Sequence, residues 1–145
     1  MGFERVSVEK LTTVIIGITV LVIAAGGVIR IYDAGESCPD WPTCFGTWGF
    51  DISEEEQKEW FDENPSEIDS RGSSHTYTSF QIFTEWIHRL LAGALLGPLV
   101  ILNWWIIRKD EELTNEVKLA SLISVLLIGW QGFLGYVTVR LDNLH

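Results

Sequence analysis

Three uncharged, mainly apolar stretches alternate with polar segments along the chain, at residues 11–29, 90–107 and 119–139. The hydrocarbon core of a bilayer, about 30 Å thick, requires about 20 residues of α-helix. The first and third stretches meet that length, and the second nearly does. The pattern therefore predicts an all-α, polytopic membrane helical bundle, with transmembrane helices over residues 11–30, 80–107 and 119–139.

The alternative for the first stretch is the apolar region of a secretory signal peptide. The stretch exceeds the usual length of about 7 to 15 residues for such a region. No Ala-x-Ala-like cleavage site follows it at residues 28–32. We therefore expect it to be retained as a transmembrane helix.

The net charge of −10 is concentrated between the first two helices. Residues 31–79 contain twelve acidic and two basic residues, whereas the rest of the chain has eight of each. A large acidic loop is predicted there, with a short loop at residues 108–118 and a tail at residues 140–145.

A short helix is expected within the acidic loop. Ser53 followed by Glu56 is a capping-box pattern, which marks the start of a helix. Its apolar residues Trp60 and Phe61 are expected to rest on the membrane surface, with the acidic residues in water.

Basic residues in short segments next to the helices predict the orientation. Arg5 and Lys10 precede the first helix, and the loop at 108–118 carries three more basic residues. Both segments are predicted to be cytoplasmic, so the 31–79 loop and the 140–145 tail are predicted to be extracytoplasmic. The chain is expected to be a multi-pass protein of the lipid bilayer with no nucleic-acid partner.

Two cysteines, Cys38 and Cys44, lie in this outward loop, and the chain has no others. An oxidising exterior permits disulfides, and Pro39 and Pro42 restrict the backbone between the two cysteines. A disulfide is therefore predicted. A structural link closing a small ring, worth about 2–3 kcal/mol, is favoured over a redox role from these residues alone.

Ionisable residues gather at the start of the second helix, in "TEWIHRLLAGALLG". Such residues inside a membrane usually face a bundle interior, a cavity or a cofactor. Glu85 and His88 share a helix face, and a neutral imidazole in an apolar bundle is a suitable axial ligand for haem iron. Glu85 is a candidate catalytic acid, and Arg89 a candidate partner for a haem propionate. The alternative is a polar cluster that only anchors the helix at the interface.

The third helix carries one amide, Gln131, among three glycines in "LIGWQGFLGYVTV". An amide in hydrocarbon needs a hydrogen-bond partner, so Gln131 is a candidate to bind another helix or a cofactor. The glycines allow close helix packing or leave room for a flat ligand.

Three of these segments resemble the haem A synthase family. "GGVIRIYDAGESCPDWPTCFG" resembles its first helix end and outer loop, "EWIHRLLAG" its E-x-x-H-R motif, and "WQGFLGYVTV" the end of its third helix. The resemblance implies an enzyme that oxidises the C8 methyl of haem O to the formyl group of haem A, which terminal oxidases require. It also implies the plasma membrane of a prokaryote, and haem O, haem A or haem B as the bound group.

By this resemblance, Glu85 matches the family's functional acid and His88 its haem-iron ligand. Cys38 and Cys44 match its loop cysteine pair, which makes a redox role as plausible as a structural one. Haem O synthase and a thiol-disulfide oxidoreductase are the partners that the resemblance implies.

One feature departs from the family pattern. A family half-unit has four helices, the fourth bearing a second histidine, whereas this chain ends at His145, where that helix would begin. His145 lies too near the membrane surface to replace that histidine. We expect a fragment, a degenerate relative, or a chain that forms a homo-oligomer or binds a partner supplying the fourth helix.

Two other classes of function remain open on the sequence. A b-type haem electron-transfer subunit would use His88 without needing Glu85. A membrane thiol-disulfide module would use the cysteines alone, although its usual C-x-x-C spacing is absent.

Overall fold

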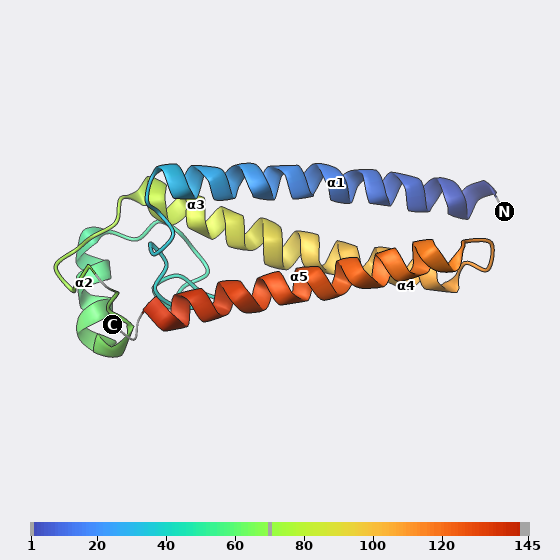
Figure 1. The fold of residues 1–145 in the computed structure, drawn as a ribbon. Helices are drawn as coiled ribbons and strands as arrows, with labels where there is room; N and C mark the ends of the chain where they lie inside the picture. Colours follow the sequence, from blue (N-terminus) through green and yellow to red (C-terminus); the bar gives the residue numbers. More distant parts are fainter. Residues whose placement is uncertain (1, 70, 143–145) are drawn as a thin grey trace. The chain divides into compact units, whose positions relative to one another are not determined.

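The structure is a computed structural model that describes residues 2–69 and 71–142. The helices follow in the order α1 (Gly2–Ile31), α2 (Glu54–Glu63), η1 (Pro65–Glu67), α3 (Ser79–Arg89), η2 (Leu90–Leu96), α4 (Gly97–Lys109) and α5 (Asn115–Asp142) (Figure 1). The three stretches long and apolar enough to cross a membrane are Val8–Ile31, Ser79–Lys109 and Asn115–Leu141. The predicted all-α class with three candidate spans is confirmed.

The second span is not a uniform α-helix, because η2 is a π-helical stretch between α3 and α4. Pro98 is the second residue of α4 and lies two residues beyond the end of η2. Proline has no N–H to donate, and its ring clashes with the carbonyl four residues earlier. A wider helical turn before Pro98 relieves that clash, so the sequence explains why the regular helix changes here.

The chain divides into two compact units. The first unit contains Met1–Ile23 and Leu90–Phe133. Thr12 and Asn103 pair within it, since the Asn103 Nδ2 donates to Thr12 Oγ1 at 3.2 Å. A polar pair of this kind satisfies both side chains where water is scarce.

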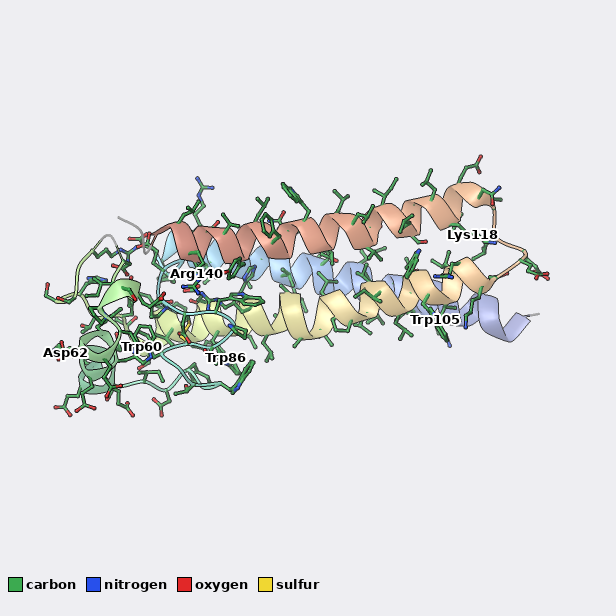
Figure 2. The ribbon with its side chains drawn as sticks, turned by 90° about the horizontal axis from the view of Figure 1, so that it is seen from below. Trp60, Asp62, Trp86, Trp105, Lys118 and Arg140 are labelled. Carbon is green, nitrogen blue, oxygen red and sulfur yellow. A yellow bond between two sulfur atoms is a disulfide. The ribbon has the colours of Figure 1, made fainter. Side chains whose placement is uncertain are left out.

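The second unit contains Ala24–Arg89 and Leu134–His145, and its hydrophobic core lies in the loop. The core residues are Cys38, Cys44, Phe45, Ile52, Phe61, Tyr77 and Ile82. α2 begins with the predicted capping box between Ser53 and Glu56, which is confirmed. Figure 2 shows Trp60 and Asp62 on this helix.

The expectation that Phe61 rests on the membrane surface is wrong. Phe61 is 3% exposed and packs edge-on against Phe45, with ring centroids 5.6 Å apart. Trp60 is half-buried and contacts the same ring at 5.5 Å. The apolar face of α2 therefore closes the core of the loop, because Phe45, immediately after the cysteine pair, offers an apolar surface that α2 can cover.

A buried amide fixes the returning chain to α2. The Gln57 side chain accepts a hydrogen bond from the Tyr77 N–H at 2.8 Å and donates to the Tyr77 carbonyl at 2.9 Å. The Tyr77 hydroxyl donates to Asp69. Burial, together with this bond to a carboxylate, raises the pKa of Tyr77. These contacts give a definite structure to a segment rich in turn-forming residues.

Candidate functional site

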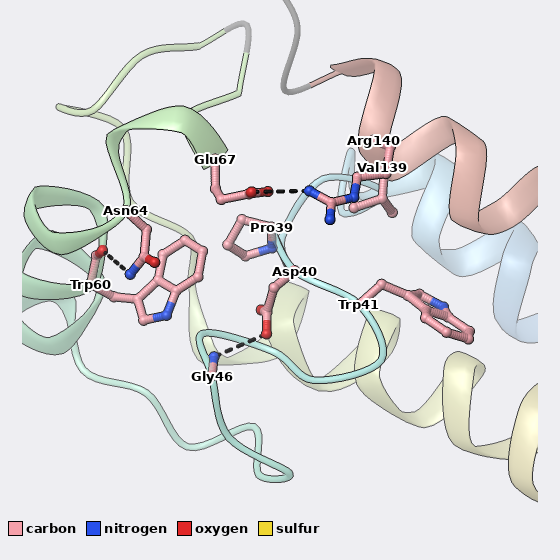
Figure 3. A pocket seen from close by; sticks show the side chains of 9 residues that line it. All are labelled: Pro39, Asp40, Trp41, Gly46, Trp60, Asn64, Glu67, Val139 and Arg140. Carbon is pink, nitrogen blue, oxygen red and sulfur yellow. Dashed lines mark hydrogen bonds and ion pairs between the residues drawn. The ribbon is translucent and has the colours of Figure 1, made fainter.

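A pocket of about 280 Å³ lies within the second unit, lined by residues that include Asp40, Trp60, Glu67 and Arg140 (Figure 3). Arg140 donates a hydrogen bond to Glu67 across it at 3.1 Å. Its volume is below the range of about 300–1,000 Å³ that is typical of small-molecule sites. No histidine or cysteine lines it. The pocket therefore lacks the side chains that ligate haem iron most often.

Cys38 and Cys44 form a disulfide, with Cα atoms 4.6 Å apart. The predicted disulfide is confirmed. The Asp40 carboxylate, between the two cysteines, accepts hydrogen bonds from the Thr43 hydroxyl and from the Gly46 N–H. We call residues 38–44 the cysteine ring. Both cysteines are 1% exposed, so the sulfur atoms are shielded from solvent.

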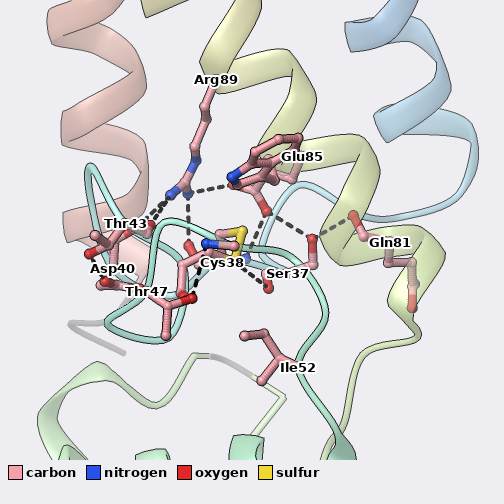
Figure 4. The surroundings of a disulfide bond; sticks show 12 residues. Ser37, Cys38, Asp40, Thr43, Thr47, Ile52, Gln81, Glu85 and Arg89 are labelled. Atoms are coloured by element: carbon pink, nitrogen blue, oxygen red, sulfur yellow. Dashed lines mark hydrogen bonds and ion pairs between the residues drawn. A yellow bond between two sulfur atoms is a disulfide. The ribbon is translucent and has the colours of Figure 1, made fainter.

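Glu85 faces the cysteine ring from α3 (Figure 4). Its Oε2 accepts a hydrogen bond from the Cys38 N–H at 2.9 Å and lies 3.0 Å from the Ser37 hydroxyl. The residue is 5% exposed, and Ser37 is fully buried. The carboxylate therefore binds the N-terminal edge of the ring.

Arg89, one turn further along the helix, binds main-chain carbonyls of the ring. Its Nη1 donates to the carbonyls of Asp40 at 2.5 Å and Thr43 at 3.0 Å. Its Nη2 donates to the Cys38 carbonyl at 2.7 Å and to Glu85 Oε1 at 2.5 Å. Both terminal nitrogens of the guanidinium thus have protein partners.

Glu85 and Arg89 together form a buried, electrically neutral pair, whose side chains are 7% and 15% exposed. Taking two charges out of water is costly, and the cost is offset only when further hydrogen bonds satisfy both groups. The main chain of the cysteine ring supplies those hydrogen bonds. The pair can therefore hold the ring on α3 and fix the direction of the Glu85 carboxylate.

His88 lies on the side of α3 that faces α1. A Cβ atom placed on Gly26 would lie 3.5 Å from the His88 Nε2. The imidazole is half-buried, and it makes no hydrogen bond with any residue that the structure describes. The His88 ring therefore lies against Gly26 of α1, close to the position where a side chain on residue 26 would begin.

The predicted site residues are divided between the two units. Gln131 is exposed on α5 and belongs to the first unit, whereas Glu85, His88 and Arg89 belong to the second. His145 and most of the predicted 140–145 tail lie outside the described residues. In the part of the chain that the structure describes, no three His, Cys, Asp or Glu residues are grouped to hold a metal ion.

Sequence reasoning missed two contributors to the site. Ser37 contacts the carboxylate of Glu85, and Gly26 contacts His88. Both stand within the segment "GGVIRIYDAGESCPDWPTCFG". Ser37 stands next to Cys38 in this segment, and that position was the available signal for it. Gly26 stands near the end of the first helix, and that position was its signal.

Comparisons with known proteins identify the family of this chain. Residues 9–144 match the model of the COX15-CtaA family, described as cytochrome oxidase assembly protein. The haem A synthase of Shewanella oneidensis is 35% identical over 123 residues, which are 85% of this chain and 34% of that protein. The haem A synthase of Halalkalibacterium halodurans is 28% identical over 127 residues, 87% of this chain and 34% of that protein.

A third relative, the haem A synthase of Orientia tsutsugamushi, is 30% identical over 123 residues, 83% of this chain and 34% of that protein. The chain spans about a third of the length of these relatives. No solved structure matches it. Because the family match covers almost the whole sequence, this chain, a multi-pass membrane protein, belongs to the COX15-CtaA family of cytochrome oxidase assembly proteins.

Proposed function

We propose that this chain is a haem-binding unit of a haem A synthase, which oxidises the C8 methyl of haem O to the formyl group of haem A. The observation that carries this proposal is the unbonded imidazole of His88 beside Gly26, on the helix that also carries Glu85 and Arg89. The choice of substrate rests on the resemblance to the haem A synthase family, and the relatives' names support it.

His88 is the residue we assign to haem iron. An iron ligand needs a free nitrogen lone pair, and His88 makes no hydrogen bond within the described chain. Gly26 allows the imidazole to lie close to the backbone of α1 without a side chain in between. The bound haem supplies the redox chemistry, whereas His88 binds and orients it. Gln131 remains a proposed contact to haem from the third helix.

Glu85 is the proposed catalytic acid. Its carboxylate is held by the Cys38 N–H, the Ser37 hydroxyl and Arg89, so its direction is fixed. A fixed carboxylate next to a haem ligand can hold or transfer a proton at a defined atom. Arg89, whose terminal nitrogens bind the ring and Glu85, is proposed to act on haem through Glu85 and the ring.

The remaining assignments follow from the family and the charge pattern. The protein is proposed to lie in a prokaryotic plasma membrane, with the N-terminus cytoplasmic and the 31–79 loop outside. The chain is proposed to act together with a second copy or a partner chain, since the matched residues make up 34% of the relative's length. Haem O synthase and a thiol-disulfide oxidoreductase are proposed partners.

The test is to express the full chain and three variants in membranes that contain haem O, alone and with a candidate partner. His88→Ala should lose the bound haem spectrum, and His88→Met should recover part of it, because thioether is an accepted axial ligand. Glu85→Gln should keep the spectrum and lose the conversion of haem O to haem A, measured by chromatography.

Two results would contradict the proposal. Unchanged haem binding by His88→Ala would remove it as the iron ligand. Unimpaired haem A formation by Glu85→Gln would remove the acid from the reaction and favour a b-type electron-transfer subunit. A thiol-disulfide module is not favoured, because both cysteines are buried.

A further inference from the structure

Four aromatic residues gather beside the cysteine ring, where the outer loop meets α3. The Phe50 ring lies 4.9 Å from that of Phe83 and 5.0 Å from that of Trp86. The Trp86 Nε1–H donates a hydrogen bond to the Trp48 carbonyl at 2.8 Å. We call Trp48, Phe50, Phe83 and Trp86 the aromatic ledge. Figure 2 shows Trp86 at the level of this loop.

The ledge exposes apolar surface that the described chain does not cover. Trp48 is 73% exposed and Phe83 37% exposed. The segment from Trp41 to Phe50 contains no charged residue, in a loop that is otherwise strongly acidic. An exposed, uncharged aromatic surface of this kind indicates a contact with another apolar phase.

The position of the ledge along the second span identifies that phase. The span extends over Ser79–Lys109, and its basic end lies at Arg108 and Lys109. A hydrocarbon core of about 20 helical residues, counted back from Ile107, ends near His88. Phe83 and Trp86 then lie in the first turns beyond the hydrocarbon, which is the headgroup region.

Trp48 is held at the same level, because its carbonyl binds the Trp86 indole. Tryptophan is enriched at this depth, where its ring contacts lipid and its N–H finds a polar partner. The acidic residues of α2 are exposed elsewhere in the loop, at Glu54, Glu55, Glu59, Asp62 and Glu63. The acidic part of the loop is thus suited to water, whereas the aromatic ledge carries no charge.

We propose that the aromatic ledge is a membrane-contact surface, through which the loop segment after Cys44 enters the interfacial layer of the outer leaflet. The occupant is the lipid surface itself, continuous with the lipid around the second span. This inference goes beyond the proposed function. The cysteine ring is then held by α3 on one side and by the bilayer on the other.

The experiment uses the full chain with spin labels at single introduced cysteines. The two native cysteines are in the buried disulfide and do not react. Trp48→Cys reports on the ledge, and the bond from Trp86 is kept because it uses the main chain. Glu59→Cys, on the exposed face of α2, is the matched control. Phe83→Cys gives an independent reading from α3.

The protein is reconstituted in vesicles of phosphatidylethanolamine and phosphatidylglycerol, and accessibility to oxygen and to a water-soluble nickel complex is measured. Positions 48 and 83 should be accessible to oxygen and severalfold less accessible to nickel than position 59. Equal nickel accessibility at positions 48 and 59 would overturn the proposal. Protection from both reagents, with spin–spin broadening that dilution by unlabelled protein removes, would instead assign the ledge to a second copy.

Discussion

Replacing Arg89 with methionine should open the cysteine ring. Arg89 makes four hydrogen bonds, three to ring carbonyls and one to Glu85. Methionine keeps much of the apolar stem but has no donor. The variant therefore removes the contacts from α3 to the carbonyls of Cys38, Asp40 and Thr43, and it leaves the Glu85 carboxylate buried without its cation.

The size of the effect follows from the burial of the pair. A hydrogen bond to a charged group contributes about 1.5–3 kcal/mol, and such terms do not add simply. Removing one partner of a buried ion pair costs about 3–5 kcal/mol, because the other charge is left unpaired. Opening the ring exposes Glu85 to water and relieves that cost. Since about 1.4 kcal/mol corresponds to a factor of ten, the open form should become on the order of 10²- to 10³-fold more populated.

The assay is the rate at which a soluble phosphine reduces the disulfide of the detergent-solubilised protein, followed by maleimide labelling and gel shift. When the ring closes faster than the reagent attacks, the rate is proportional to the open population. Arg71→Met is the matched control, because Arg71 binds Asp33 and Glu36 in the same loop. Its reduction rate should stay close to that of the unmodified chain.

Equal reduction rates for Arg89→Met and the unmodified chain would refute this reasoning. A double variant, Glu85→Leu with Arg89→Met, separates the two causes. Removing both charges is often nearly neutral, so the double variant should be reduced more slowly than Arg89→Met. If it is reduced as fast, the lost carbonyl contacts and not the unpaired carboxylate control the ring.

Three further predictions concern other parts of the chain. Gly26→Val should lower haem retention, measured by absorbance of the purified protein, because its side chain fills the space beside His88; Gly27→Val, with open space around it, should not. The Ser53 N–H and hydroxyl lower the pKa of Glu56. The cap should therefore stabilise α2 at pH values above the ordinary glutamate pKa of about 4.3, and this stabilisation should be lost as the pH falls through the lowered pKa. Hydrogen exchange of α2 amides should show that loss of stability. The Glu56→Gln variant should show no such pH-dependent loss. For the orientation, an impermeant maleimide applied to intact cells should label Ser74→Cys and not Glu111→Cys, both at exposed positions; labelling of Glu111→Cys alone would reverse the topology.

The three membrane spans could be predicted because they depend on local composition. An uncharged stretch of about 20 residues is sufficient to indicate a spanning helix. The disulfide was predictable for a similar reason, since Cys38 and Cys44 are close in sequence and have no competitors. The capping box at Ser53 is also a local signal. Each of these features involves residues a few positions apart.

The contacts that build the site could not be predicted in this way. The partners of Arg89 in the ring are 46 to 51 residues away in sequence. The core that buries Phe61 was missed because Phe45 and Tyr77 come from different parts of the loop. An amphipathic helix shows which face is apolar, but it does not show whether lipid or protein covers that face. Gln131 shows the same limit, since its need for a partner says nothing of where that partner lies.

The geometry links the two roles considered for the cysteine pair. The sulfur atoms are shielded, so a thiol can reach them only after the packing around the ring has opened, and movement of the ring away from α3 is one such opening. That movement breaks the bond from the Cys38 N–H to Glu85 and the bonds from Arg89 to the ring. A redox change at the cysteines would therefore alter the surroundings of the Glu85 carboxylate directly. A purely structural disulfide would keep that carboxylate in one environment. The reduced protein thus separates the two roles: if haem A formation survives reduction unchanged, the ring does not control Glu85.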